Sequence, residues 1–232
     1  MQIGGWQKNS LIDYPGKLSC VIFLAGCNFT CPYCHNPTLA RGYPARVNGI
    51  EREEVYAFLE NRRGFLDGVV ISGGEPTLQP DLFSLCAGIK EMGYPVKLDT
   101  NGSRPRVLKA LIDAGLIDYI AMDLKTAPHH YPDFIIKDFD PVPIFSSIRI
   151  IMESELAYEF RTTCLKPIVT DHAIRQIGPL IEGARLYVLQ RFCDRGVLQP
   201  EFLQNNDYAY ADAELMQLKT VAETWVAKCV VR

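Results

Sequence analysis

The segment Ser19–Cys34, SCVIFLAGCNFTCPYC, contains the two features that decide the fold. It begins with an apolar, partly β-branched run, which predicts a buried strand. Directly after that run come three cysteines within eight positions, Cys27, Cys31 and Cys34. In parallel α/β sheets the chemistry gathers at the carboxyl ends of the strands, so this arrangement favours such a sheet with a site at that edge.

Five further strand-like runs follow, and helical patterns separate them. The predicted strands are Ser19–Leu24, Gly68–Ser72, Val96–Asp99, Tyr119–Asp123, Glu159–Cys164 and Arg185–Gln190. The predicted helices are Glu51–Arg62, Asp81–Met92, Arg106–Ala114, Pro143–Glu153, Ala173–Glu182 and a long amphipathic Ala211–Lys228. This alternation predicts a parallel sheet covered by helices. A full eightfold barrel usually takes about 250 residues, so six units fit a partial barrel or an open doubly wound sheet.

Composition excludes several classes of function. The 232 residues are 48% apolar and 22% charged, which suits a globular protein with a full core. The net charge is −3, with no cluster of Lys or Arg, which argues against binding nucleic acid. No apolar run approaches the roughly 18–20 residues of a membrane span, and the first residues lack a secretory signal. We therefore expect one cytoplasmic domain over residues 1–232, with its core over about 17–192.

The clustered cysteines predict a metal centre. A [4Fe–4S] cluster normally takes four thiolates, so three would leave one iron open to a small ligand, as in a catalytic zinc site. Three alternatives stay open: a zinc site completed by His35, a c-type haem on CPYCH (31–35), and a thioredoxin-like redox pair. The other cysteines are expected to be buried packing residues: Cys20, Cys86, Cys164, Cys193 and Cys229.

The cysteine loop, with Tyr33 before its last cysteine, resembles the signature of the radical S-adenosylmethionine (SAM) enzymes. Further motifs make the chain similar to the glycyl-radical-enzyme activases, especially the compact type named for anaerobic ribonucleoside-triphosphate reductase. These motifs are SLIDYPGK (10–17), HNP (35–37), SGGEPT (72–77), DTNG (99–102) and MDLK (122–125). The resemblance implies an α/β fold, a partial (β/α)6 TIM-like barrel of the radical SAM type.

The resemblance also implies a mechanism. Cys27, Cys31 and Cys34 would hold one [4Fe–4S] cluster, whose open iron binds SAM. One electron would cleave SAM to methionine and a 5′-deoxyadenosyl radical, which removes a hydrogen atom from a glycine Cα. The implied partners are a glycyl-radical enzyme, namely anaerobic ribonucleoside-triphosphate reductase, and a low-potential electron donor such as flavodoxin or ferredoxin.

Particular residues acquire expected roles from the same resemblance. The implied cofactor-binding residues are Tyr33, Gly73, Gly74, Glu75, Thr100, Asp123, Lys125 and Arg161. The Gly73–Glu75 segment would bind the SAM amino group, and Arg161 would pair with the SAM carboxylate. Asp99 and Asp123 would hold a monovalent cation. The plain alternatives are an ordinary Gly-Gly turn, a solvated Asp–Lys pair and a surface arginine.

Several weaker expectations complete the prediction. His35 would hydrogen-bond the cluster sulfurs or the loop backbone, and Gln190 would face the mouth of the site. Asp13–Lys17, at the rim of that mouth, and Arg191–Asn206 are the expected partner contacts. Two other functions stay open. One is a radical SAM enzyme acting on a small molecule, similar to 7-carboxy-7-deazaguanine synthase, and the other is a non-catalytic iron–sulfur electron-transfer or sensor protein.

Overall fold

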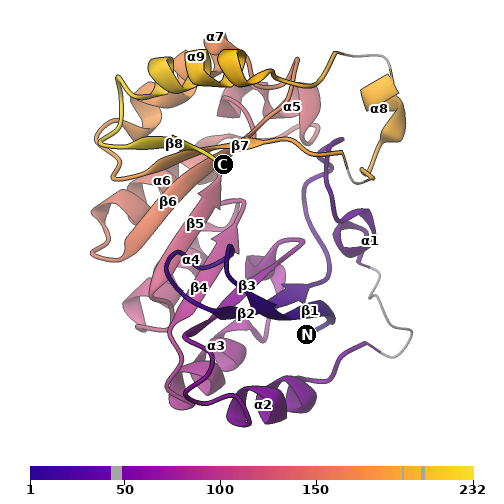
Figure 1. Ribbon diagram of the computed structural model, residues 1–232, viewed down its shortest axis with the longest axis vertical. Helices are drawn as coiled ribbons and strands as arrows, with labels where there is room; N and C mark the ends of the chain where they lie inside the picture. Colours follow the sequence, from indigo (N-terminus) through magenta and orange to yellow (C-terminus); the bar gives the residue numbers. More distant parts are fainter. Residues whose placement is uncertain (43–48, 195, 205–206) are drawn as a thin grey trace. The chain divides into compact units, whose positions relative to one another are not determined.

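The computed structural model describes residues 1–42, 49–194, 196–204 and 207–232, which form two compact units (Figure 1). The first unit contains Met1–Asn28, Asn36–Thr100 and Arg106–Ile120. The second contains Phe29–His35, Asn101–Pro105 and Ala121–Arg232. In both units the order of the strands in the sheet follows their order in the chain. The cysteine loop thus begins in the first unit, with Cys27, and continues in the second, with Cys31 and Cys34.

The first unit is built on four strands. They are β1 (Ile3–Ser10), β2 (Ser19–Leu24), β3 (Gly68–Gly73) and β4 (Val96–Thr100). β1 runs antiparallel to β2, whereas β2, β3 and β4 are parallel. The parallel strands are buried almost throughout because both of their faces are covered. The helical elements of this part are α1 (Pro37–Ala40), α2 (Arg52–Glu60), η1 (Pro76–Leu78), α3 (Leu82–Glu91) and α4 (Pro105–Asp113).

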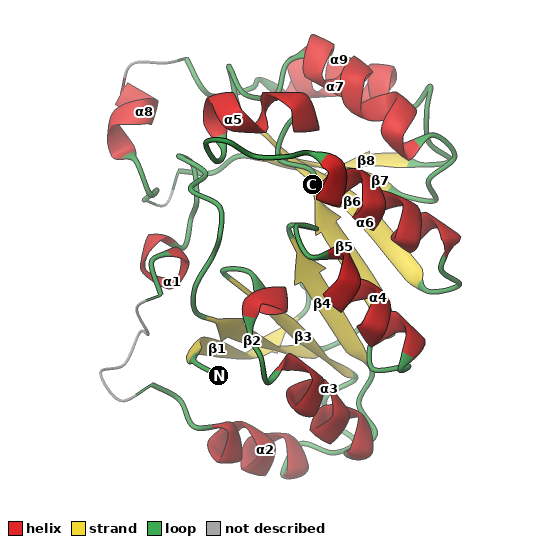
Figure 2. Cartoon of the chain, turned by 180° about the vertical axis from the view of Figure 1, so that it is seen from behind, coloured by secondary structure: helices red, strands yellow, loops and turns green. Residues whose placement is uncertain are grey.

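The second unit continues the parallel pattern. β5 (Tyr119–Asp123) begins in the first unit and ends in the second, and β6 (Ala157–Cys164), β7 (Tyr187–Arg191) and β8 (Cys229–Val231) follow. The helical elements are η2 (Pro128–His130), α5 (Tyr131–Phe134), α6 (Val142–Glu153), α7 (Asp171–Ile177), η3 (Gly178–Ile181), α8 (Pro200–Gln204) and α9 (Asp212–Ala222). α7 and α9 lie side by side in both views (Figures 1 and 2).

The predicted strands are confirmed as β2 to β7, with ends shifted by no more than two residues. Two other predictions are wrong. The long helix Ala211–Lys228 ends at Ala222, and β8 follows it because its β-branched residues pair with the edge of β7. The helix predicted over Ala173–Glu182 stops at Ile177, where Pro179 continues it as the 3₁₀ turn η3.

β1 was not predicted at all, for a reason visible in its composition. Its sequence IGGWQKNS has two glycines and a polar end, so it lacks the apolar run that marked the other strands. It forms because it pairs with β2, from Ile3 opposite Leu24 to Ser10 opposite Ser19. Non-local pairing of this kind leaves no local pattern to recognise.

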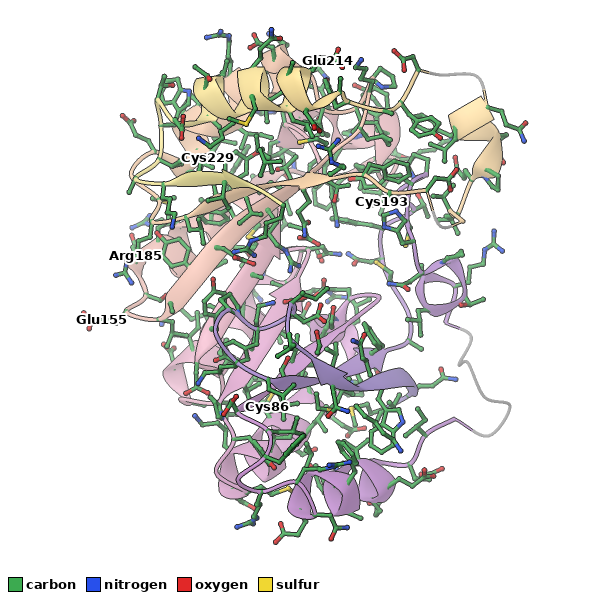
Figure 3. All side chains as sticks on the ribbon, in the orientation of Figure 1. Cys86, Glu155, Arg185, Cys193, Glu214 and Cys229 are labelled. Carbon is green, nitrogen blue, oxygen red and sulfur yellow. The ribbon has the colours of Figure 1, made fainter. Side chains whose placement is uncertain are left out.

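The scattered cysteines follow the prediction with one exception. Cys20, Cys86, Cys164 and Cys229 are buried, as expected of packing residues. Cys193 is exposed, so the packing prediction is wrong for it (Figure 3). It follows Phe192 just beyond the end of β7. In the part of the chain that the structure describes, no helix is both long and apolar enough to cross a bilayer.

Candidate functional site

A Gly-Gly turn at the end of β3 packs against the backbone that leads to Cys27. Gly73 has a φ of +125°, and a Cβ there would lie 2.2 Å from the Leu24 carbonyl oxygen. A Cβ on Gly74 would lie 2.1 Å from the carbonyl oxygen of Gly26. The amides of Gly74 and Glu75 donate to Leu24 and Gly26, each over 2.8 Å. Only glycine permits this close approach, so the two glycines hold the start of the cysteine loop.

The side chain of Glu75 is a buried anchor within the first unit. Its Oε1 accepts the Thr77 backbone N–H over 3.1 Å and the Thr100 hydroxyl over 2.7 Å, and it also accepts the Thr77 hydroxyl. These bonds join η1 to the end of β4 and satisfy a carboxylate that burial would otherwise penalise. The turn and the DTNG segment are therefore one connected structure.

Asp99 has two partners within the first unit. One carboxylate oxygen, Oδ1, forms an ion pair with the ammonium of Lys97, which lies on the same face of β4. The other, Oδ2, accepts the hydroxyl of Ser72 on β3 over 3.3 Å. The sequence analysis missed Lys97, although its place two residues before Asp99 on a strand could have indicated the pairing.

Three predicted residues meet in the second unit, where Arg161 in the middle of β6 lies beside the end of β5. Asp123 accepts Arg161 Nε over 2.7 Å and Lys125 Nζ over 2.9 Å. Burial alone would raise the pKa of Asp123 and lower that of Lys125. The attraction between the charges instead holds the pKa of Asp123 well below, and that of Lys125 well above, its ordinary value. One acid and two bases leave this trio with one excess positive charge.

The part of the cysteine loop that belongs to the second unit is held from several directions. The amide and hydroxyl of Thr30 both donate to the carbonyl of Ile135, each over 2.9 Å. The ring of Phe29 makes edge contacts with two further rings, Tyr131 at 5.7 Å and Phe139 at 5.4 Å. An aromatic cluster, in which Phe29 and Tyr131 are buried and Phe139 is half-buried, thus fixes the loop just before Cys31.

The segment that follows β7 also binds this loop. The amide of Leu198 donates to the carbonyl of Cys34 over 3.1 Å, and that of Gln199 donates to Pro32 over 3.0 Å. The ring of His35 stacks on Phe192 with a centroid distance of 5.1 Å. Of the segment predicted for partner contact, Arg191–Asn206, residues 195, 205 and 206 lie outside the described residues.

Two tyrosines bracket the main chain of Lys125. The Tyr33 hydroxyl donates to the Lys125 carbonyl over 3.5 Å, and the Lys125 amide donates to the Tyr131 hydroxyl over 3.1 Å. Both tyrosines are buried, and burial raises the pKa of each hydroxyl. Tyr131 was missed from the sequence, because no motif surrounds it. In the second unit, Lys125 and the cysteine loop thus belong to one hydrogen-bonded network.

The predicted position of Asp13–Lys17 at the rim of the mouth is wrong. This loop connects β1 to the beginning of β2, and Tyr14 packs against Gly68 at the beginning of β3. The segment therefore lies at the amino edge of the parallel strands, whereas Cys27 and Asp99 follow or end strands at the carboxyl edge. The position of the DYPGK motif depends on the direction in which β2 runs, and the motif itself does not indicate that direction.

The donors present fit an iron–sulfur cluster with SAM beside it. The loop supplies three cysteines, of which Cys27 and Cys34 are half-buried and Cys31 is buried, and thiolates are the ligands that such clusters take. The Gly73–Gly74 turn packs so closely on the backbone before Cys27 that a Cβ at either glycine would clash with it. Across the described ranges, no three His, Cys, Asp or Glu side chains converge on a point that would hold one metal ion.

Comparison with known proteins identifies the class to which this site belongs. The family model of the radical SAM superfamily matches residues 21–175, and the chain therefore belongs to that superfamily and is an enzyme. A protein of Methanocaldococcus jannaschii assigned to the glycyl-radical enzyme activating enzymes is 36% identical over 99% of this chain and 95% of its own length. The chain is thus a member of the glycyl-radical enzyme activating group.

Other relatives define the breadth of the similarity. A 7-carboxy-7-deazaguanine synthase of Haemophilus influenzae is 32% identical over 61% of this chain and 57% of its own. The crystal structure of Streptococcus suis SuiB bound to S-adenosylmethionine superposes with a TM-score of 0.66 at 13% identity. It covers 91% of this chain, which spans about half (51%) of the SuiB chain. This likeness confirms the fold, a partial α/β barrel of the radical SAM type.

Proposed function

We propose that this protein installs a glycyl radical on a partner enzyme, by removing a hydrogen atom from a glycine Cα. The observation that carries the proposal is the similarity along almost the full length of both chains to the M. jannaschii activating enzyme. The partner that we propose is an anaerobic ribonucleoside-triphosphate reductase, because DYPGK and HNP, together with the cysteine loop, resemble the activases of that enzyme.

We assign the cluster to the cysteine loop. Cys27, Cys31 and Cys34 would hold three irons of a [4Fe–4S] cluster and leave the fourth for SAM. When bound, the cluster and SAM supply the one-electron chemistry that removes the hydrogen atom. The protein contributes a fixed loop, because Thr30, Leu198 and Gln199 restrain its backbone.

The charges of the second unit suit the polar end of SAM. The excess positive charge shared by Asp123, Lys125 and Arg161 would attract the SAM carboxylate. In the first unit, the carbonyls of Gly73 and Gly74, in a turn held against the backbone before Cys27, would accept the SAM amino group. Glu75 would act through Thr100, whose hydroxyl it holds, and Tyr33 would position Lys125.

The partner that we propose is a protein because the proposed substrate is a glycine residue within a peptide chain. Glycine has no side chain, so its main chain can enter a narrow site as an extended peptide. We propose that the described residues of Arg191–Asn206 contact this peptide, because the segment is bonded directly to the cysteine loop. The electron would come from a low-potential donor such as flavodoxin or ferredoxin.

The experiment combines the reconstituted protein with the reductase, SAM and reductant without oxygen. We expect a glycyl-radical signal in electron paramagnetic resonance and an equal amount of 5′-deoxyadenosine. Cys31→Ser should abolish both products, whereas Cys86→Ala, which changes a packing cysteine of α3, should leave them unchanged. Failure to form 5′-deoxyadenosine would contradict the radical SAM chemistry itself.

A second candidate function follows from the H. influenzae relative, a 7-carboxy-7-deazaguanine synthase that matches 61% of the chain. Under that alternative the protein would act on a small heterocyclic molecule, and no glycyl radical would form on any reductase. Formation of 5′-deoxyadenosine without a protein radical, and with turnover of such a small molecule, would favour this function over the activase.

A further inference from the structure

Lys97 is the one lysine whose side chain is buried in the part of the chain that the structure describes. It lies in the middle of β4 with 1% of its surface exposed. Its ammonium pairs with Asp99 and lies 5.9 Å from the ring centroid of Tyr119. An ammonium in such surroundings is costly unless it is paired, so its presence in a sheet core requires an explanation.

The geometry fixes the Asp99 carboxylate from two sides. Lys97 and Asp99 are two residues apart on one strand and therefore share a face. Lys97 lies nearer the amino end of β4 than Asp99 does. Lys97 holds Oδ1, and Ser72 of the neighbouring strand β3 donates to Oδ2. The carboxylate thus stands at the carboxyl edge of β4 in a set orientation.

Asp99 adjoins the segment that we assign to SAM. The next residue, Thr100, donates to Glu75 of the Gly-Gly turn, on the other face of β4. Movement at Asp99 would therefore be transmitted through one peptide bond to Thr100. A charged pair at this point can set the position of a segment that contributes to the cofactor site.

We infer that Lys97 is a positioning residue for the SAM site, acting as the built-in counter-ion of Asp99. The inference rests on the proposed function, since it takes Asp99 and Thr100 as part of that site. It gives the carboxylate a fixed cation supplied by the chain itself. A dissolved monovalent cation is then unnecessary at Asp99 in the wild-type protein and becomes useful only when Lys97 is removed.

The test compares Lys97→Met with Lys90→Met. The control removes another lysine of the first unit, which pairs with Asp118 over 2.6 Å but is 30% exposed. SAM affinity is measured from the change in the cluster spectrum, and thermal unfolding of the cluster-free protein is followed in KCl and in choline chloride at equal ionic strength. We expect Lys97→Met to bind SAM at least tenfold more weakly, while Lys90→Met stays within twofold of wild type.

The unfolding measurement provides a readout independent of the loaded enzyme. KCl should raise the unfolding temperature of Lys97→Met more than choline chloride does, because K⁺ can replace the missing cation. It should not do so for the wild type or for Lys90→Met. A wild-type protein that needs K⁺ to bind SAM, or a Lys97→Met protein that binds SAM as the control does, would overturn the inference.

A double variant covers the case in which Lys97→Met does not fold. Lys97→Met combined with Asp99→Asn removes both charges, so folding should recover, yet SAM affinity should remain at least tenfold weaker than wild type. Recovery of wild-type affinity in the double variant would show that the pair has no role at the site. If the wild type itself neither binds nor cleaves SAM, the proposed function fails instead.

Discussion

Replacement of Gly74 by alanine tests how the Gly-Gly turn supports the cysteine loop. The new Cβ would lie 2.1 Å from the carbonyl oxygen and 2.6 Å from the carbonyl carbon of Gly26, the residue before Cys27. Cβ atoms in proteins essentially never approach other heavy atoms within 3.0 Å, so the two backbones must separate by roughly 0.9 Å. Both atoms that must yield belong to the main chain, so no side chain can absorb the shift.

The size of the effect follows from that separation. The bonds from the amides of Gly74 and Glu75 to Leu24 and Gly26, now 2.8 Å long, would stretch beyond hydrogen-bonding distance. Two weakened hydrogen bonds and local overpacking together cost about 2–4 kcal/mol of unfolding free energy. For a protein of this size, that corresponds to a fall in the unfolding temperature of roughly 4–15 °C. A displacement of about 1 Å at Cys27 should lower the rate of SAM cleavage about 100-fold.

The assay measures iron content, thermal unfolding and 5′-deoxyadenosine formation for the wild type, Gly74→Ala and a matched control. The control is Gly5→Ala in β1, where the new Cβ would have only one neighbour within 4 Å, a Phe23 ring carbon at 3.9 Å. Gly5→Ala should behave as the wild type does. If Gly74→Ala binds iron and cleaves SAM at the wild-type rate, the turn does not position Cys27 and our reasoning is wrong.

Two further predictions concern the second unit. The pKa of Asp123 is held below its ordinary value near 3.9. The pairing of Asp123 with Arg161 therefore stabilises the protein fully above about pH 5. This contribution decreases as the pH falls through the pKa of Asp123 in the folded state. Asp123→Asn should therefore lower the unfolding free energy by about 2–4 kcal/mol at pH 7 and by less at pH 3 in urea unfolding; an equal loss at both pH values would contradict the pairing. Tyr131→Phe removes the acceptor of the half-buried Lys125 amide, which should cost about 1–2 kcal/mol and weaken SAM binding, measured by calorimetry. A Tyr131→Phe protein as stable as the wild type would show that the hydroxyl is not needed.

The strands that the sequence predicted are those whose signal is local. β2 and β3 carry unbroken apolar runs because both faces of a parallel sheet are covered. β1 and β8 depend on pairing with a neighbouring strand. The short strand Cys229–Val231 comes directly after residues whose sequence pattern predicts a helix. Tertiary pairing overrides local propensity at exactly such edges.

The candidate site shows the same difference between residues with a local sequence signal and residues without one. The MDLK motif at the end of β5 singled out Asp123 and Lys125, and the structure joins both of them to Arg161 of β6. Lys97 and Tyr131 had no motif, since their roles depend on which side chains pack against them. The direction of the chain also matters: within the first unit DYPGK precedes β2 and so lies at the opposite edge from Cys27, which follows β2.

The central claim is that three thiolates hold a cluster with one iron available to SAM. The most direct measurement is electron paramagnetic resonance of the reduced, anaerobically reconstituted wild-type protein, before and after SAM is added. We predict about four irons per chain and a [4Fe–4S] signal that changes when SAM binds. Bound zinc or haem, or a cluster signal that SAM leaves unchanged, would contradict the claim.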